Sequence, residues 1–308
     1  MTVTEAESLI AIDWGITNRR GYLLDRNSNV LEMRHDDVGI MNLGSSPFTA
    51  ALSDFIHDWR DQSAVEPPVL MSGMVGSRQG WIEAPYVACP VRRSDLIRDI
   101  VPVPGLRNCF IVPGVSLSDR AGRQDVMRGE EIQIFGAVRL NGQDSAILCL
   151  PGTHSKWAHI KDGWLVDFTT AMTGELFQVI CEHSILGALM NTQSHHDEAA
   201  FSKGVDASGR TGGLLSHIFS VRADGLFGML SNSEQYSYLS GILIGHEIRD
   251  LSETYEANNK EVLLVGSATL AAIYGAAMTQ LGLRYLTVDG DVATICGISD
   301  LWSARPKP

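Results

Sequence analysis

The sequence lacks the features that mark membrane, secreted or disulfide-rich proteins. It has no apolar run long enough to span a bilayer, and its acidic start, MTVTEAES, has no basic region followed by an apolar signal core. The five cysteines are scattered, form no C-x-x-C pair and are odd in number, which favours buried, reduced thiols. These absences predict a cytoplasmic protein with no membrane partner.

The sequence also lacks an excess of positive charge. Its formal net charge is −12, and no basic stripe offers a surface to the phosphates of nucleic acid, which argues against a nucleic-acid partner. It has no helix-turn-helix pattern and no spare N-terminal segment to hold one, which argues against a DNA-binding regulator. A small anionic substrate stays compatible with this charge if a few Arg and Lys side chains are well placed.

The composition is that of a globular protein with room for two domains of ordinary size, at 308 residues and 44% hydrophobic content. The opening stretch LIAIDWGITNRRGYLLD (9–25) predicts a strand, a tight turn and a second strand, hence an antiparallel hairpin. Asp13 ends the first strand, and Gly15 lets backbone N–H groups approach a ligand. Such a turn suits nucleotide phosphates with Mg²⁺, although a lone D-x-G turn is a weak signal.

The chain contains two halves with one plan. In the first half, the hairpin is followed by a strand at 30–34, a helix at 47–61, a strand at 69–72, a Gly-rich segment at 73–90, a helix at 94–101, a strand at 109–112 and a helix at 125–140. In the second half we expect a strand at 145–150, a turn at 151–155, a hairpin across Asp162-Gly163, helices at 175–190, 212–222 and 233–255, a strand at 262–265, a helix to 281, a strand at 284–288 and a helix at 292–302. We therefore predict domains 1–142 and 143–308, with a ligand cleft between them.

Six motifs in this order resemble a known family: IDWGITNRRGYLLD (12–25), SGMVGSRQGW (72–81), DVMRGEEIQIFGA (125–137), LPGTHSKW (150–157), MTGELF (172–177) and LVGSATLAAIYGAA (264–277). The sequence resembles the sugar kinases of the hexokinase–actin–heat-shock-ATPase superfamily, and more closely the 2-dehydro-3-deoxygalactonokinase family. The resemblance implies a duplicated ribonuclease H-like fold. It also implies ATP and Mg²⁺ as cofactors, and phosphorylation of the terminal hydroxyl of a 2-keto-3-deoxy sugar acid in galactonate catabolism.

The resemblance also implies a nucleotide site. Its expected residues are Asp13, Gly15, Thr17 and Asn18 in a first phosphate loop, Gly152, Thr153, Ser155 and Lys156 in a second, and Gly266 and Ser267 beside the adenosine. Asp13 would bind the metal. Two departures bear on this: Ile16 replaces a small hydroxyl residue, and Leu150-Pro151 stands where the wider superfamily often has an acidic residue.

The expected catalytic residues are Asp125, as the base that accepts the substrate hydroxyl's proton, and Glu130, as a backup base or substrate contact. For Asp125, a plain helix N-cap is the alternative. Four residues are expected at the substrate: Asn42, Arg78, Trp81 and Glu175. Arg78 would clamp the carboxylate with two parallel hydrogen bonds. Asn42 has a turn role as its alternative, Trp81 a core role, and Glu175 a charge at a helix start.

Three alternatives stay open at this point. The chain could phosphorylate another sugar or sugar acid, hydrolyse nucleotide or polyphosphate on the same scaffold, or sense a sugar without catalysis. The sequence determines neither the preferred stereochemistry nor the oligomeric state, and leaves a homodimer open.

Overall fold

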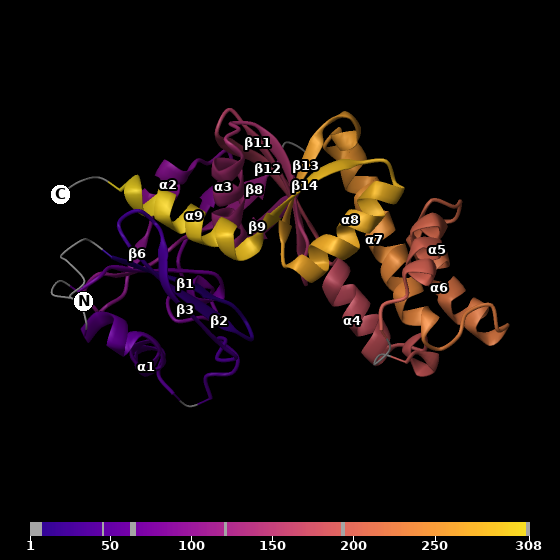
Figure 1. Ribbon diagram of the computed structural model, residues 1–308, viewed down its shortest axis with the longest axis horizontal. Helices are drawn as coiled ribbons and strands as arrows, with labels where there is room; N and C mark the ends of the chain where they lie inside the picture. Colours follow the sequence, from indigo (N-terminus) through magenta and orange to yellow (C-terminus); the bar gives the residue numbers. More distant parts are fainter. Residues whose placement is uncertain (1–7, 45, 62–65, 120–121, 192–194, 306–308) are drawn as a thin grey trace. The chain divides into compact units, whose positions relative to one another are not determined.

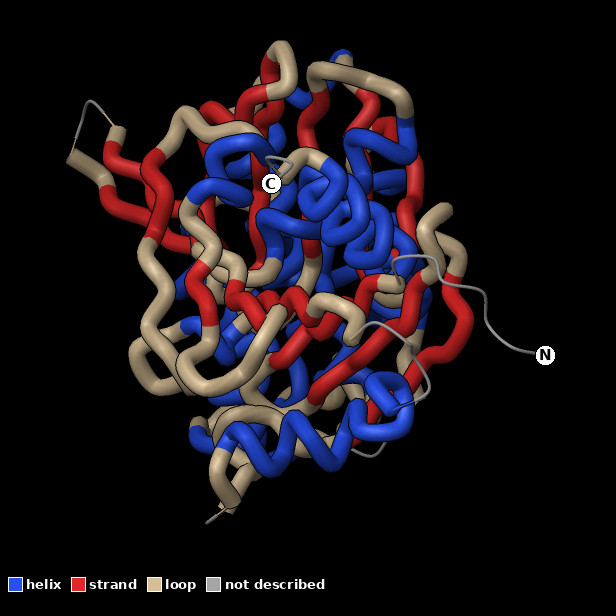
Figure 2. Tube along the Cα trace, turned by 90° about the vertical axis from the view of Figure 1, so that its left-hand side faces the viewer, coloured by secondary structure: helices blue, strands red, loops and turns tan. Residues whose placement is uncertain are grey.

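The structure of the chain, a computed structural model, describes residues 8–44, 46–61, 66–119, 122–191 and 195–305. Helices and strands mix throughout, which confirms the predicted α/β class (Figures 1 and 2). The chain divides into two compact units. Unit 1 comprises residues 1–145, 160–167 and 290–308, and unit 2 comprises residues 146–159 and 168–289. The boundary between residues 142 and 143 stays a prediction.

A six-stranded sheet in the order β3-β2-β1-β4-β7-β6 forms the frame of unit 1. Its strands are β1 (Leu9–Trp14), β2 (Arg19–Leu24), β3 (Val30–Asp36), β4 (Val69–Ser72), β6 (Val101–Pro102) and β7 (Cys109–Ile111). The predicted opening hairpin is confirmed, since β1 and β2 pair antiparallel over their full lengths. On the other side of β1, β4 runs parallel and sets Ser72 opposite Asp13. The Gly-rich segment therefore starts beside the end of β1.

A second large sheet repeats this order. It runs β12-β11-β10-β13-β14, and its strands are β10 (Ala146–Leu150), β11 (Ser155–Lys161), β12 (Trp164–Ala171), β13 (Glu261–Gly266) and β14 (Arg284–Asp289). Strands β3-β2-β1-β4-β7 match it one by one, with the short antiparallel β6 as an addition at the edge. In both sheets the first strand lies parallel to the strand that returns after a helix. The predicted duplication is therefore confirmed.

The start of the helix predicted at 125–140 is wrong. Strands β8 (Gly114–Ser118) and β9 (Gln124–Met127) form an antiparallel pair, which β5 (Tyr86–Ala88) extends into a three-stranded sheet. Asp125 lies on β9, opposite Leu117, and opens no helix. Helix α3 (Glu130–Asn141) begins only after Gly129, whose φ of 105° is a left-handed conformation that a continuous right-handed helix cannot contain.

Helix α1 (Phe48–Asp61) packs an apolar face on the six-stranded sheet. Its buried Leu52, Ile56 and Trp59 join Ile12 and Trp14 of β1 in one core cluster. This is the spacing of three to four residues that predicted the helix, and it explains why α1 forms where expected.

Unit 1 also holds α2 (Arg93–Arg98) and α9 (Gly290–Ser303), the final helix of the chain. Helix α9 lies in backbone contact with α3. A Cβ atom at Gly136 would lie 1.9 Å from the carbonyl oxygen of Ala293, and one at Gly297 would lie 2.1 Å from that of Ile132. Each helix thus needs glycine where the other crosses it.

The remaining helices belong to unit 2: α4 (Thr173–His183), α5 (Glu198–Ser208), α6 (Gly213–Leu226), α7 (Glu234–Thr254) and α8 (Ala268–Gln280). Helix α4 ends earlier than predicted because Ser184 is extended, and α5 is an element that the sequence analysis did not predict. Helices α5, α6 and α7 lie side by side (Figure 1). Among the described residues, no helix combines the length and apolarity needed to cross a membrane.

Candidate functional site

The first predicted phosphate turn is a tight loop between β1 and β2. The N–H of Gly15 donates to the carbonyl of Asn18 at 2.9 Å, which closes the turn. Thr17 and Asn18 are exposed, so their side chains are available to a ligand. Ile16, one of the two departures noted in the sequence, is also exposed, at 44%.

Backbone hydrogen bonds connect this turn to a neighbouring segment, residues 39–41. The N–H groups of Gly39, Ile40 and Met41 donate to the carbonyls of Thr17, Gly15 and Ile16 at 3.0–3.2 Å. A Cβ atom at residue 39 would lie only 2.2 Å from the nearest of these backbone atoms, so the two segments touch. The turn is therefore held in shape before any ligand binds.

Asp13 sits at the end of β1 with its side chain 25% exposed. Burial raises its pKa to about 6, while the guanidinium of Arg20 works in the opposite direction and the charges of Glu130 and Asp291 add to the rise. Arg20 lies between the two aspartates, 3.9 Å from Asp13 and 3.5 Å from Asp291. Asp13 is thus an ionised oxygen donor at neutral pH, surrounded by acidic groups.

Two glycines bring the start of α3 to Asp13. A Cβ atom at Gly73 would lie 3.1 Å from Oδ1 of Asp13, and one at Gly129 would lie 3.2 Å from the Cα atom of Gly73. The next residue after Gly129 is Glu130, whose charge acts on Asp13. Glu130 accepts a hydrogen bond from the Arg128 N–H at 3.0 Å, which orients its carboxylate.

Glu131, the residue after Glu130, is fully buried. Its Oε2 accepts the N–H of Gly129 at 2.7 Å. Burial, and next the charge of Glu130, raise the pKa of Glu131 to about 8, so it holds a proton at neutral pH. A neutral Glu131 does not add a further negative charge beside Glu130 and Asp13.

Asp125, the predicted base, has different neighbours. It lies 3.8 Å from the guanidinium of Arg123, which also pairs with Asp119 and Asp167 at 3.1 and 3.0 Å. Its side chain is 14% exposed. The argument that placed a carboxylate at a helix start therefore fails for Asp125 and applies to Glu130.

The second predicted phosphate turn, 151–155, belongs to unit 2. Thr153 and His154 are exposed, whereas Ser155 and Lys156 are buried. The Nζ atom of Lys156 donates to the carbonyl of His154 at 3.1 Å. Fewer of the predicted phosphate-binding residues are exposed than the sequence suggested. The contact of Ser155 and Lys156 with phosphate stays a prediction.

The start of α4 closes around the same turn. The N–H of Glu175 donates to the carbonyl of Thr153 at 2.9 Å, and its carboxylate contacts the imidazole of His154. Glu175, expected at the substrate, thus has a partner inside the turn. At the end of β13, Gly266 faces Pro151, since a Cβ atom there would lie 3.9 Å from the proline ring, and Ser267 caps α8 through the N–H of Leu270.

Comparison with known proteins identifies the family. The model of the 2-keto-3-deoxy-galactonokinase family matches residues 13–301. The chain belongs to this family. A 2-dehydro-3-deoxygalactonokinase of Escherichia coli (strain K12) is 36% identical over 292 residues, which cover 95% of this chain and 96% of that protein.

Solved structures agree with this assignment. A crystal structure of a candidate 2-dehydro-3-deoxygalactonokinase from Sinorhizobium meliloti matches with a TM-score of 0.89 and 32% identity, covering 96% of this chain and 98% of that one. The activator of 2-hydroxyisocaproyl-CoA dehydratase from Clostridium difficile, with bound ADPNP, matches with a TM-score of 0.52 at 12% identity, over 96% and 95% of the two chains. The second likeness concerns the fold alone, which is of the actin and hexokinase type.

The kinase's predicted substrate residues have mixed surroundings. Arg78 is exposed in the Gly-rich segment. Trp81 stacks on Phe48 at a centroid distance of 5.7 Å and meets Trp14 edge-on at 6.5 Å, which is the core role that the sequence analysis left open. The amide of Asn42 donates to the carbonyls of Thr17 and Asp37 at 3.1 and 3.0 Å, which is its alternative turn role.

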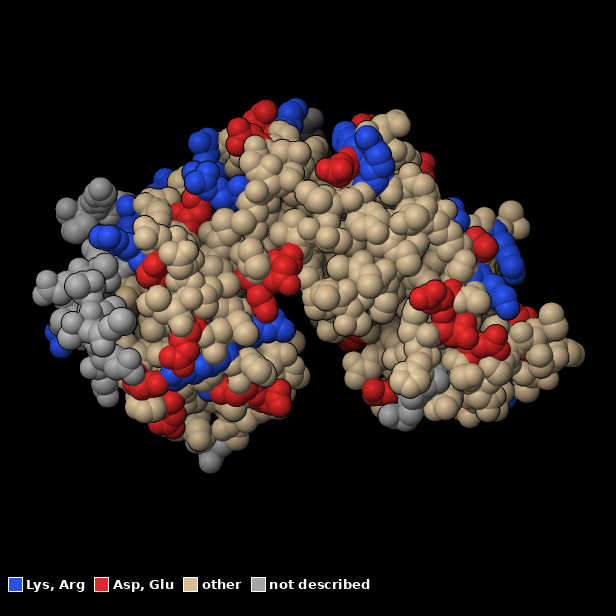
Figure 3. Space-filling model, in the orientation of Figure 1, with Lys and Arg blue, Asp and Glu red and all other residues tan. Residues whose placement is uncertain are grey.

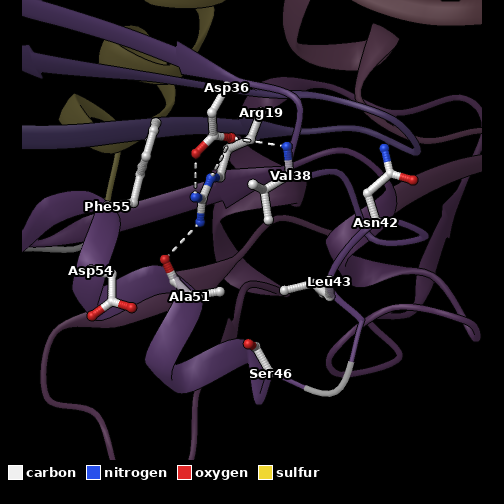
Figure 4. Close-up of a pocket in the computed structure, with 9 residues that line it drawn as sticks. All are labelled: Arg19, Asp36, Val38, Asn42, Leu43, Ser46, Ala51, Asp54 and Phe55. Atoms are coloured by element: carbon white, nitrogen blue, oxygen red, sulfur yellow. Dashed lines mark hydrogen bonds and ion pairs between the residues drawn. The ribbon is translucent and has the colours of Figure 1, made fainter.

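Asn42 also lines a cavity of about 420 Å³ in unit 1 (Figure 4). The only guanidinium drawn there, that of Arg19, is engaged: it pairs with both oxygens of Asp36 at 3.2 and 2.6 Å and donates to the carbonyl of Ala51 at 2.8 Å. The described residues that line this cavity also include Asp54, and none of them offers a spare positive charge to a sugar acid.

Sequence reasoning missed Arg128, which precedes the carboxylates of this kinase. Its side chain is 8% exposed, lies over the ring of Tyr86 and donates from Nη2 to the carbonyl of Ala84 at 2.7 Å. Its Nε and Nη1 atoms are buried with no hydrogen-bond partner among the described residues. The signal was available in the motif RGEE (128–131), where a single glycine separates a cation from two acids.

Proposed function

We propose that this chain transfers the γ-phosphoryl group of ATP to the terminal hydroxyl of 2-dehydro-3-deoxy-D-galactonate, forming the 6-phosphate. The observation that carries the proposal is the convergence of Asp13 and Glu130 through Gly73 and Gly129, in a chain of this kinase family. Phosphoryl transfer needs positioned charges and a proton acceptor, and these two carboxylates can supply them.

Asp13 fits a magnesium ion as its protein ligand. It offers a carboxylate oxygen that is ionised at neutral pH, at a strand end with acidic neighbours. In the described part of the chain no group of three or more His, Cys, Asp or Glu side chains could hold a metal. Mg²⁺ needs no such group, since it commonly uses one or two carboxylates together with substrate phosphates and waters. When bound, Mg²⁺ would supply positive charge that neutralises the transferred phosphate.

Glu130 takes the role of general base in this proposal, in place of Asp125. Its carboxylate is oriented by the Arg128 N–H and accepts the proton of the attacking hydroxyl. The turns 13–18 and 151–155 act as phosphate-binding turns through backbone N–H groups and the exposed hydroxyls of Thr17 and Thr153. Gly266 and Ser267 lie beside the adenosine.

The substrate carboxylate requires a cation. Charged groups of both signs intermix on the face drawn in Figure 3, so a local guanidinium matters more than the overall field. Arg78 is our candidate clamp because it is exposed. Arg78→Leu should raise the KM for the sugar acid about tenfold or more, as expected for losing a bidentate charged contact, with an unchanged KM for ATP. An unchanged KM for the sugar acid would remove Arg78 from the proposal and turn attention to Arg128.

The deciding assay measures ADP release from ATP and Mg²⁺ with and without a panel of hexonate-derived keto acids. The proposal requires release that depends on 2-dehydro-3-deoxy-D-galactonate and yields a phosphorylated acid. Release without any acid would indicate a phosphohydrolase, release with another acid a different kinase, and saturable sugar binding without release a regulator. Each of these outcomes would overturn the proposal. The cytoplasmic location stays a prediction.

A further inference from the structure

Helix α7 carries a buried carboxylate in the middle of its apolar face. Glu247 is 6% exposed, and Leu243 and Ile248 beside it belong to the apolar cores of unit 2. Its Oε1 atom accepts the indole N–H of Trp157 at 3.0 Å, and its Oε2 atom accepts the hydroxyl of Tyr274 at 2.7 Å. Side chains from β11 and α8 thus meet on one residue of α7.

The contacts of Tyr274 continue to the second phosphate turn. Its hydroxyl lies 3.0 Å from Oγ of Ser155, and that Oγ accepts the N–H of Gly152 at 3.4 Å. Tyr274 and Ser155 are 2% and 0% exposed, so water does not compete for these bonds. An unbroken path of hydrogen bonds therefore runs from Glu247 to the backbone of the turn.

The carboxylate fixes the direction of every bond on this path. The Tyr274 hydroxyl donates its single proton to Glu247, so it must accept the hydrogen bond from the Ser155 hydroxyl. The Ser155 oxygen is then left as the acceptor for the N–H of Gly152. Thr173, at the start of α4, adds a further side-chain hydrogen bond to Glu247. A Cβ atom at the next residue, Gly174, would lie 2.4 Å from the carbonyl oxygen of Gly152, so the backbone of α4 also contacts the turn closely.

Packing alone does not explain this residue. Burial raises the pKa of Glu247, which reflects the cost of keeping a carboxylate away from water, while its hydrogen bonds with Thr173, Tyr274 and Trp157 act in the opposite sense. A leucine of similar size would avoid that cost. Retaining the acid makes sense where the orientation of its donors matters.

We infer that Glu247 is a positioning residue that holds the turn 151–155 in its phosphate-binding shape through Tyr274 and Ser155. The inference rests on the proposed function, because a preset turn matters only if it binds a nucleotide's phosphates. Glu247 itself touches no substrate.

Two variants separate positioning from stability. Tyr274→Phe removes the hydroxyl that connects Glu247 to Ser155, whereas Trp157→Phe removes a different direct hydrogen bond to Glu247 and leaves that path intact. Both should unfold at lower denaturant concentration than the wild type. Only Tyr274→Phe should raise the KM for ATP, roughly two- to tenfold, the range for losing one buried hydrogen bond. The kcat at saturating ATP and the KM for the sugar acid should stay close to wild type.

Glu247→Gln adds a test that keeps the shape of the side chain. Its amide has only one accepting oxygen, so it should keep the fold but raise the KM for ATP as Tyr274→Phe does. Equal KM values for the Tyr274 and Trp157 variants, or an unchanged KM in Tyr274→Phe, would overturn the inference. Equilibrium binding of a non-hydrolysable ATP analogue should show the same ranking. If the wild type releases no ADP with any sugar acid, the proposed function fails, and the analogue binding still decides the inference.

Discussion

At the scale of single residues, the acidic groups beside the first turn differ in what they can do. The charge of Glu130 acts on Asp13, Glu131 is buried and protonated, and Asp125, on strand β9, pairs with Arg123. Four carboxyl groups that look alike in the sequence thus have four different environments in the structure.

Glu130→Gln should lower kcat by at least about 10²-fold, the low end for a positioned general base, while ATP still binds. Asp125→Asn is the matched control, because it removes a carboxylate five residues away without touching Asp13. It should leave kcat within a few-fold of wild type. Steady-state ADP release with the sugar acid measures both, and a larger loss in the Asp125 variant would restore the prediction made from the sequence.

Glu131 should make stability depend on pH. Its pKa rises from the usual 4.5 to about 8 on folding, so the folded state holds this proton longer than the unfolded state. Its contribution is greatest below pH 4.5 and is lost as pH rises to 8, by about 1.4 kcal/mol per pH unit at most. Glu131→Gln keeps the acceptor for the Gly129 N–H and has no such titration.

Denaturant unfolding at pH 5, 7 and 9 tests this. The stability of Glu131→Gln relative to wild type should grow between pH 5 and 7, grow again to 9, and level off above the folded pKa. A constant difference across these values would mean that Glu131 titrates normally in the folded protein.

At the scale of elements, α3 shows how a helix end can build a site. Gly129 and Gly142 flank the helix, and both have left-handed φ angles, of 105° and 65°. Only Gly129 faces the site, since a Cβ atom there would meet Gly73, whereas one at Gly142 would meet nothing within 4 Å.

Gly129→Ala should therefore reduce kcat strongly, by about tenfold or more, because it moves Glu130 away from Asp13, and should destabilise the fold by about 1–3 kcal/mol. Gly142→Ala carries the same kind of backbone strain at the other end of α3 and should leave kcat unchanged. Comparing kcat at matched stability separates the two effects. Equal kcat values for the two variants would contradict the role given to Gly129.

The sequence predicted the elements whose signals are local. The first turn follows from an apolar strand, an acid and a glycine within seven residues, and α1 from apolar side chains three and four apart. It did not predict where α3 begins, because a left-handed Gly129 leaves no trace in the hydrophobic pattern. Glu247 was missed for a related reason: one acid within an apolar helix face carries no sign of its partners on β11 and α8.

At the scale of the whole chain, the final helix completes unit 1 rather than unit 2. The N-terminal turn of α9 sets Asp291 beside Arg20, and Tyr22 donates to Asp291 at 3.0 Å. Helix α9 also contacts α3, the helix that carries Glu130. The electrostatic field at Asp13 therefore depends on residues that lie far apart in the sequence.

Gly297→Val should test this dependence, since its side chain would collide with the backbone of Ile132 on α3. We expect a loss of several kcal/mol in the free energy of unfolding, as for overpacking against backbone, and a fall in kcat. Val292→Ala, a change at a position of α9 that is 49% exposed, should stay within about 0.5 kcal/mol of wild type. A Gly297 variant with wild-type stability and kcat would show that α3 and α9 can separate without consequence.

The position of α9 has a consequence for how the protein is made. Synthesis proceeds from the N-terminus, so the ribosome produces the turn at Asp13 well before Asp291. Until α9 emerges, Gly136 of α3 lacks its contact with Ala293, and Asp291 does not yet lie beside Arg20. A chain released before α9 would contain both phosphate turns but would lack a complete unit 1. Such a truncated chain should be unable to consume ATP.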